Sequence, residues 1–161
     1  MNILAKNYIA MPVKPSKINA FLFFKLPAAY FCGVRVKSIT ETSCVTSVKH
    51  RWINQNPFNS MFWAVQGMAA ELSTGALLIS IVKERKKDIS MLVAKNQATF
   101  SKKARGRITF TCNDGNVIRE AVEHTIATGE GQTCSMTSVG RDSKGDIVST
   151  FEFEWAVKLR S

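Results

Sequence analysis

The longest hydrophobic run in the chain, MFWAVQGMAAELSTGALLISIV, extends from Met61 to Val82 and contains one ionisable residue, Glu71, at its midpoint. A run of this length raises the question of a membrane span, because about 20 apolar residues cross a bilayer. Glu71 would then lie at the bilayer centre, with Gln66 and Ser73 also in lipid, and the chain has no second hydrophobic segment of this kind. We therefore expect a core helix buried on nearly all sides.

Both ends of the run carry signals for helix termini. Asn59 or Ser60 stands just before it and can cap a helix N-terminus with its side chain. Basic residues follow the run and suit the negative end of the helix dipole; they are Lys83, Arg85, Lys86 and Lys87. These signals predict a helix over residues 61–82.

The remaining pattern predicts two further helices and six strands. Apolar residues at helical spacing predict a short helix from Pro15 to about Phe24, ended by Pro27, and an amphipathic helix from Val117 to Ile126. Runs bounded by turn residues predict strands at 33–39, 44–51, 89–100, 107–112, 133–139 and 147–159. This order favours one α+β domain in which a predominantly antiparallel sheet packs around a long helix.

The composition of the chain favours some classes of binding partner over others. The chain has 161 residues, 45% of them hydrophobic, and a formal net charge of +10, which favours polyanionic partners such as nucleic acid, acidic lipid or a phosphorylated cofactor. Its four cysteines form no Cys-x-x-Cys pattern and its two histidines lie far apart, so we expect no metal site. Reduced core cysteines and the lack of an export signal predict a cytoplasmic protein.

Glu71 lies on a helix face of small residues. Gly67, Gly75 and Thr74 stand three or four residues from it, and residues at this spacing share a face. Two glycines within a helix cost about 1 kcal/mol each relative to alanine, so something should approach closely there. Two interpretations remain open. In the first, a substrate chain lies along the stripe with Glu71 as general base or nucleophile. In the second, a strand or partner helix packs into the stripe and Glu71 is hydrogen-bonded to its backbone.

Two further segments are candidates for binding anions. The loop Asn56–Ser60 leads into the positive end of the long helix, where an oxyanion or phosphate is favoured. The turn Ser101–Arg107 carries cations that could meet the phosphates of a nucleotide-type cofactor or could simply be solvated. Nucleic acid is disfavoured, because Phe100 and Phe110 on either side of this turn are expected in the core rather than exposed for stacking.

The helix and its entry loop resemble those of the hotdog-fold acyl-CoA thioesterases, especially the group of phenylacetate-pathway and hydroxybenzoyl-CoA thioesterases. That group carries Asn-His-x-Gly-x-x-His-Gly-Gly, six further residues and then a catalytic Asp on the central helix. When Asn56 is aligned with the first residue of this motif, Phe62, Trp63 and Ala64 occupy the last three positions. Six residues follow, and Glu71 then occupies the position of the catalytic Asp without a gap. Hotdog thioesterases use either Asp or Glu, but Phe62, Trp63 and Ala64 replace the His-Gly-Gly that helps to build the oxyanion hole.

The resemblance implies a single hotdog domain over residues 1–161, with residues 1–30 as an N-terminal extension that contains the short helix. It implies a homodimer or dimer of dimers paired through the sheets, with acyl-CoA or a related acyl thioester as substrate or ligand and no required cofactor. The expected activity is thioester hydrolysis. The alternative is a non-catalytic hotdog protein that binds acyl-CoA or an acyl chain.

The resemblance also implies roles for individual residues. Glu71 would activate water or attack the thioester carbonyl, and Asn56 would position the nucleophile or the loop. The backbone N–H groups of Phe62, Trp63 and Ala64 would bind the developing oxyanion. The acyl chain would lie along the small-residue stripe described above. The basic residues near the mouth of the site would meet the phosphates of coenzyme A; they are Lys102, Lys103 and Arg105.

Overall fold

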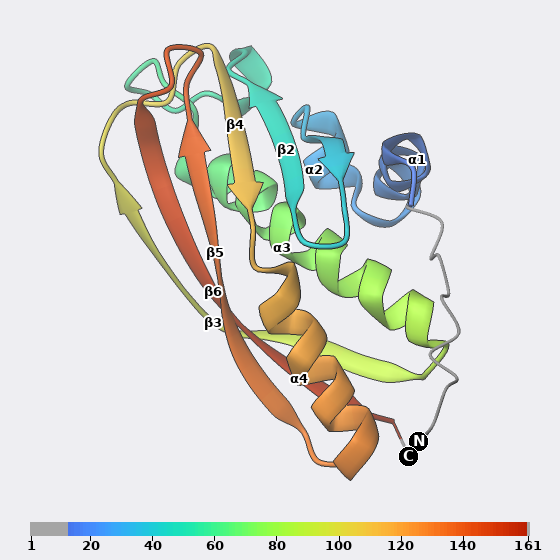
Figure 1. Ribbon diagram of the computed structural model, residues 1–161. Coiled ribbons are helices and arrows are strands. Elements are labelled where there is room, and N and C mark those ends of the chain that lie inside the picture. Colours follow the sequence, from blue (N-terminus) through green and yellow to red (C-terminus); the bar gives the residue numbers. More distant parts are fainter. Residues whose placement is uncertain (1–12, 161) are drawn as a thin grey trace.

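The computed structural model describes residues 13–160. Its helices and strands alternate in the predicted order (Figure 1). They are α1 (Pro15–Lys25), α2 (Pro27–Phe31), β1 (Arg35–Ile39), β2 (Cys44–Lys49), the 3-10 turn η1 (Trp52–Asn54), α3 (Trp63–Arg85), β3 (Ile89–Phe100), β4 (Arg107–Cys112), α4 (Gly115–Thr128), β5 (Gln132–Arg141) and β6 (Ile147–Leu159).

The strands form one antiparallel sheet in the order β1-β2-β4-β5-β6-β3. The long helix α3 lies against one face of this sheet, and α4 packs beside it (Figure 1). The two short helices α1 and α2 lie near β1. The fold is therefore α+β, with its longest helix against the face of an antiparallel sheet, as the pattern predicts.

Four polar contacts join α3 to the sheet inside the core. Thr46 of β2 donates a hydrogen bond to the Ala69 carbonyl (2.7 Å), and the hydroxyl of Ser73 pairs with that of Ser138 on β5 (2.7 Å). On β6, Ser149 donates to the Gln66 side chain and Trp155 to the Thr74 hydroxyl. Buried polar groups are tolerated when they are hydrogen-bonded. Gln66, Ser73 and Thr74 of the apolar run thus face the sheet.

Most predicted elements are confirmed. The strands at 89–100, 107–112 and 147–159 have the predicted bounds, and the amphipathic helix extends over Gly115–Thr128. The first short helix runs to Lys25, but Pro27 begins a second helix, α2, instead of ending helical structure. Proline is favoured at a first helical position, where its missing N–H costs nothing.

The N-terminus of α3 differs from the prediction. The helix begins at Trp63, its N-cap is Phe62, and no side chain caps it. The expected caps are engaged elsewhere, because Ser60 hydrogen-bonds to the Asn56 side chain and Asn59 adopts a left-handed turn with φ 56°. The N–H of Phe62, at the N-cap position, is hydrogen-bonded to the Asn54 carbonyl.

Two expectations about burial are also corrected. Phe110 is fully buried, whereas Phe100 is 48% exposed at the end of the edge strand β3 and only its ring edge meets Phe151. The side of α3 that carries Glu71 is open, so the helix is not buried on nearly all sides. Among residues 13–160, α3 alone is long and apolar enough to cross a membrane, and 61% of its apolar window is buried within the protein.

Candidate functional site

An apolar groove runs along the open side of α3 and encloses a volume of about 530 Å³. Its walls come from α3 and from the α1–α2 segment, while Met91 of β3 and Trp155 of β6 contribute from the sheet. Among the described residues that line it, Glu71 is the only acid and Lys25 the only base. A concave apolar space with few polar groups is the usual form of a small-molecule site.

Glu71 projects from α3 into this groove. Its side chain reaches solvent through the mouth, yet the surrounding apolar groups displace enough water to raise the pKa of its carboxyl group above the ordinary value. Within residues 13–160 its carboxylate has no hydrogen bond or ion pair. An unpaired carboxylate in apolar surroundings is a stronger base than one in water.

The small-residue stripe divides between the sheet and the groove. A Cβ added at Gly67 would lie 3.5 Å from the ring of Phe151, and one at Gly75 would lie 3.4 Å from Trp155. Thr74 is fully buried. Strand β6 therefore packs against much of the stripe, as the second interpretation expected, but among the described residues the Glu71 side chain makes no hydrogen bond to the backbone of this strand. Gly75 also lines the groove beside Glu71.

The hydrogen bond between Trp155 and Thr74 gives a test of this packing. Thr74→Val should lower the free energy of unfolding by about 1–3 kcal/mol, because the near-isosteric change leaves the buried indole N–H without an acceptor. Urea unfolding measures the change. Thr99→Val, at an exposed position of β3, is the control and should stay within about 0.5 kcal/mol of the wild type. Equal stabilities of the two variants would contradict the assignment.

Asn56 organises the entry loop. Its side-chain oxygen accepts hydrogen bonds from the Phe58 N–H (3.0 Å) and from Ser60, and its amide nitrogen donates to the Met61 carbonyl (3.4 Å). The buried Asn54, which the sequence analysis missed, fixes the preceding turn by bonding to the Cys32 and Lys49 carbonyls. The Asn56 side chain thus stabilises the entry loop, and the same hydrogen bonds fix its own orientation.

The N–H groups expected to bind an oxyanion are not equivalent. That of Phe62 is already bonded to Asn54. Those of Trp63 and Ala64, at the first two positions of α3, have no partner among the described residues, as is normal at a helix N-terminus. Ala64 precedes Glu71 by seven residues, about 10 Å along the helix axis. These donors therefore lie about two helical turns before the backbone of Glu71 in the same chain.

The basic turn lies beside the entry loop. The Met61 N–H donates to the Ala104 carbonyl (2.8 Å), and Arg105 donates to the Asn59 carbonyl (3.0 Å). Lys103 is exposed. The sequence does not reveal this proximity, because β3 and the whole of α3 separate the two segments along the chain.

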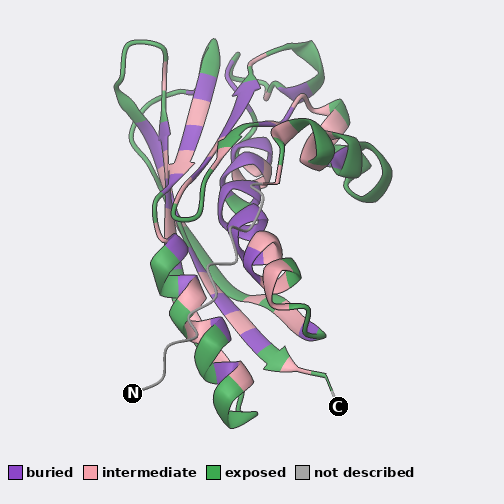
Figure 2. Ribbon diagram, turned by 45° about the vertical axis from the view of Figure 1, so that its right-hand side comes forward, coloured by how far each residue is buried: buried purple, intermediate pink, exposed green. Residues whose placement is uncertain are grey.

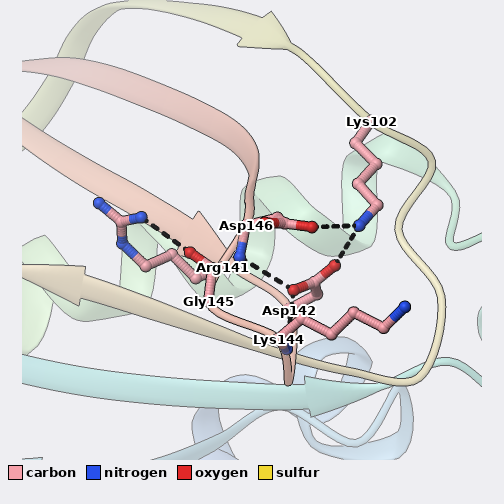
Figure 3. A network of polar contacts seen from close by, with 6 residues as sticks. All are labelled: Lys102, Arg141, Asp142, Lys144, Gly145 and Asp146. Atoms are coloured by element: carbon pink, nitrogen blue, oxygen red, sulfur yellow. Dashed lines mark hydrogen bonds and ion pairs between the residues drawn. The ribbon is translucent and has the colours of Figure 1, made fainter.

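Lys102 is engaged by the neighbouring β5–β6 turn (Figure 3). Its ammonium bonds to Asp142 (2.6 Å) and Asp146 (2.8 Å), and Asp142 also accepts the N–H groups of Lys144 and Asp146. The pKa of Lys102 is raised, chiefly by the hydrogen bond to Asp142, and the pKa of Asp142 is lowered by the same contact. A phosphate would meet Lys103 and Arg105 more readily than Lys102.

Sequence reasoning missed the groove wall formed by α1 and α2. Phe21, Lys25 and Leu26 line the groove opposite α3. The sequence signal for this wall was the density of large apolar residues around Pro27. Periodicity alone does not show which part of the protein such residues contact.

A six-stranded antiparallel sheet packed on one long helix defines a hotdog fold, and in this protein a carboxylate lies in an apolar groove along that helix. The chain belongs to the family described as domain of unknown function DUF4442, whose model matches residues 16–157. No curated protein matches the chain.

Solved structures share the fold at low sequence identity. A Pseudomonas aeruginosa protein of unknown function, described as a probable thioesterase, is 20% identical with a TM-score of 0.75, covering 94% of this chain and 99% of that one. A Chlorobaculum tepidum protein of unknown function is 15% identical, with a TM-score of 0.77 and coverages of 91% and 94%. A Haemophilus influenzae thioesterase is 10% identical, with a TM-score of 0.70 and coverages of 93% and 94%.

Proposed function

We propose that the protein hydrolyses an acyl thioester, with acyl-CoA as the substrate class and Glu71 as the catalytic group. The observation that carries the proposal is the unpaired Glu71 carboxylate, with its raised pKa, in an apolar groove of about 530 Å³. The groove suits an acyl chain, and the carboxylate is the only acid among the described residues that line it. The thioesterases among the similar structures support the same chemistry.

Two routes are open to Glu71. As a general base it takes a proton from water while the water oxygen attacks the thioester carbonyl, and the thiolate then leaves and is protonated. As a nucleophile it attacks the carbonyl itself, and water hydrolyses the resulting anhydride. Both routes need the ionised carboxylate, and both give a carboxylic acid and a free thiol.

The oxyanion donors would come from a second copy of the chain. Trp63 and Ala64 are about 12 and 10 Å along the α3 axis from their own Glu71, so a site that combines these donors with a carboxylate is more readily built from two helices. The outer edge of β3 has no partner strand among the described residues, and pairing there would extend the sheet across a homodimer. Asn56 would keep the entry loop in place, and Lys103 and Arg105, with Lys102 behind them, would meet the phosphates of coenzyme A.

A non-catalytic acyl-CoA-binding protein is the second candidate. The exposed rings of Phe62 and Trp63 favour it, because they flank the N–H groups that an oxyanion would need. In this case Glu71 would limit which ligands enter the groove rather than activate water.

Hydrolysis of acyl-CoA esters of graded chain length, measured by thiol release, separates the two candidates. We expect turnover with at least one ester and, in native mass spectrometry, a dimer that retains no intact ester after incubation. A retained, unhydrolysed acyl-CoA would instead support the binding protein. Failure to hydrolyse or bind any ester would contradict both proposals.

A further inference from the structure

The two N-terminal helices expose a cluster of large apolar side chains on the surface of the protein. Phe24 is 76% exposed and Phe31 59% exposed, and Phe23 and Leu26 beside them are also open to solvent. The rings of Phe23 and Phe24 pack in a T shape (5.0 Å between centroids), and Phe31 lies 6.2 Å from Phe23, so the three rings form one cluster. Leu26 lies in the chain between the two helices. We call Phe23, Phe24, Leu26 and Phe31 the α1–α2 aromatic surface. Exposed residues predominate on the outer side of these helices (Figure 2).

The fold does not require this exposure. Leu22 and Ala29 already bury the inner side of α1 and α2, and Asn19 fixes α1 to β1 through two hydrogen bonds with the backbone of Val36. Leaving four large apolar side chains in water is unfavourable, and contiguous exposed apolar patches mark interaction sites.

The charged residues of the N-terminal segment that carries this surface all have one sign. Residues 1–40 contain six basic residues and no Asp or Glu. Lys14, Lys17 and Lys25 are exposed on or next to α1. Within α1, Lys17 is four residues before Phe21 and Phe24 is three residues after it, so these side chains share one side of the helix, and Lys14 stands at the N-cap just before α1. Lysine side chains can cover apolar surface with their stems while their ammonium groups reach outward.

We propose that the α1–α2 aromatic surface docks on an anionic phospholipid bilayer. Interfacial helices bind such membranes by inserting aromatic and aliphatic side chains below the headgroups while flanking lysines meet the lipid phosphates. The one-sided charge makes the surface complementary to acidic lipid. Another protein of neutral or basic surface would lack this complementarity, and single-stranded nucleic acid would need rings free to stack singly rather than packed edge to edge.

The position of the groove fits this partner. Leu26 belongs to the aromatic surface and also lines the groove, as does the neighbouring Lys25, so the groove opens beside the proposed membrane contact. Apolar chains held at a bilayer surface are therefore next to the apolar space in front of Glu71. The proposed membrane docking is independent of the proposed hydrolysis, because none of the four residues of the docking surface reacts with a substrate.

Vesicle co-sedimentation of the full chain tests the proposal. We expect binding to vesicles of phosphatidylcholine and phosphatidylglycerol in a 3:1 ratio, weaker binding at high salt and little binding to pure phosphatidylcholine. Phe24→Ser combined with Phe31→Ser should weaken binding about tenfold through the lost insertion. Lys14→Gln combined with Lys17→Gln should also weaken it about tenfold, since each lysine contributes separately to the attraction.

Matched control variants test whether removing any exposed aromatic ring or any exposed lysine weakens vesicle binding. Phe58→Ser removes a side chain that is 70% exposed in the α3 entry loop, and Lys144→Gln removes a lysine of the β5–β6 turn. Both should bind vesicles like the wild type. Circular dichroism should show every variant folded, because the substituted side chains are exposed.

Several results would overturn the proposal. They are equal binding to neutral and anionic vesicles, no binding to either, or a Phe58→Ser loss as large as that of the double phenylalanine variant. A change of oligomeric mass on substitution of Phe24 and Phe31 would assign the surface to a second copy of the chain. Displacement from vesicles by single-stranded RNA at equimolar phosphate would assign it to nucleic acid.

Discussion

Glu71→Gln is expected to lower kcat for acyl-CoA hydrolysis by about 10²–10⁴, the range that a positioned acid or base contributes. The amide keeps the size of the side chain and its place in the groove but can neither accept a proton from water nor attack the carbonyl. Glu71→Ala should be at least as impaired. Thiol release under saturating substrate measures the effect, and KM should change little if the groove alone binds the acyl chain.

The control for this substitution is Glu120→Gln, which changes an exposed carboxylate on α4 and should leave kcat unaltered. Wild-type activity in both Glu71 variants would remove Glu71 from the mechanism and favour the binding protein.

The pH profile provides a second test of the same group. Because the apolar groove raises the pKa of Glu71, activity should fall as the pH drops through a value above that of an ordinary glutamate. Stability should respond in the opposite sense. The folded state binds the proton more tightly than the unfolded state, so stability is greatest below the unfolded pKa and decreases as the pH rises through the folded pKa. Glu71→Gln should lack both effects and be no less stable than the wild type at neutral pH.

Gly115→Ala is expected to cause the largest loss of stability, about 2–3 kcal/mol or more. A Cβ at this first position of α4 would lie 2.5 Å from the Thr42 Cα and 2.7 Å from the Glu41 carbonyl oxygen. These are backbone atoms, and the Gly115 N–H is itself bonded to the Thr42 carbonyl (3.0 Å), so the neighbouring loop cannot yield without losing that contact. Thermal or urea unfolding measures the change.

Gly67→Ala is the matched control, because the same added methyl group meets the ring of Phe151 at an ordinary 3.5 Å. This substitution should stabilise the protein by about 0.5–1 kcal/mol, since alanine is the better helix former. The same variant tests the stripe as a substrate path. Unchanged activity in Gly67→Ala would show that the substrate does not lie against Gly67, whereas a rise in KM would place it there. Similar stability of the two alanine variants would contradict the packing at Gly115.

Periodicity was enough to predict the sheet and the helices that cover it. The alternation from Phe151 to Leu159 predicted the bounds of β6, and the apolar run around Glu71 predicted that a long helix forms there, although this helix extends to Arg85 rather than ending at residue 82. The start of α3 did not follow, because Asn59 and Ser60 have good capping side chains whose partners lie in the entry loop. Local propensity cannot anticipate such competition.

The site was predictable only in part. Spacing selected Glu71, and the structure places its unpaired carboxylate in an apolar groove. Spacing could not tell which side of α3 the sheet would cover. Both the glycine stripe and the opposite side offered small residues, and the aromatic rings of β6 occupy much of the stripe. The groove wall from α1 and α2 and the pairing of Lys102 with two aspartates depend on contacts between distant segments.

The pairing of β3 with β6 also affects how the chain folds during synthesis. All eleven residue pairs of this ladder join segments on either side of β4, α4 and β5, and β6 is translated after all of them. Until then β3 has no partner on either edge, and its ladder with β6 forms slowly because the two strands are far apart in the sequence. An unpaired strand of 12 residues can associate with other nascent chains. The polar centre of β3, Lys95-Asn96-Gln97, opposes that association, so it protects the chain on the ribosome before β6 completes the sheet.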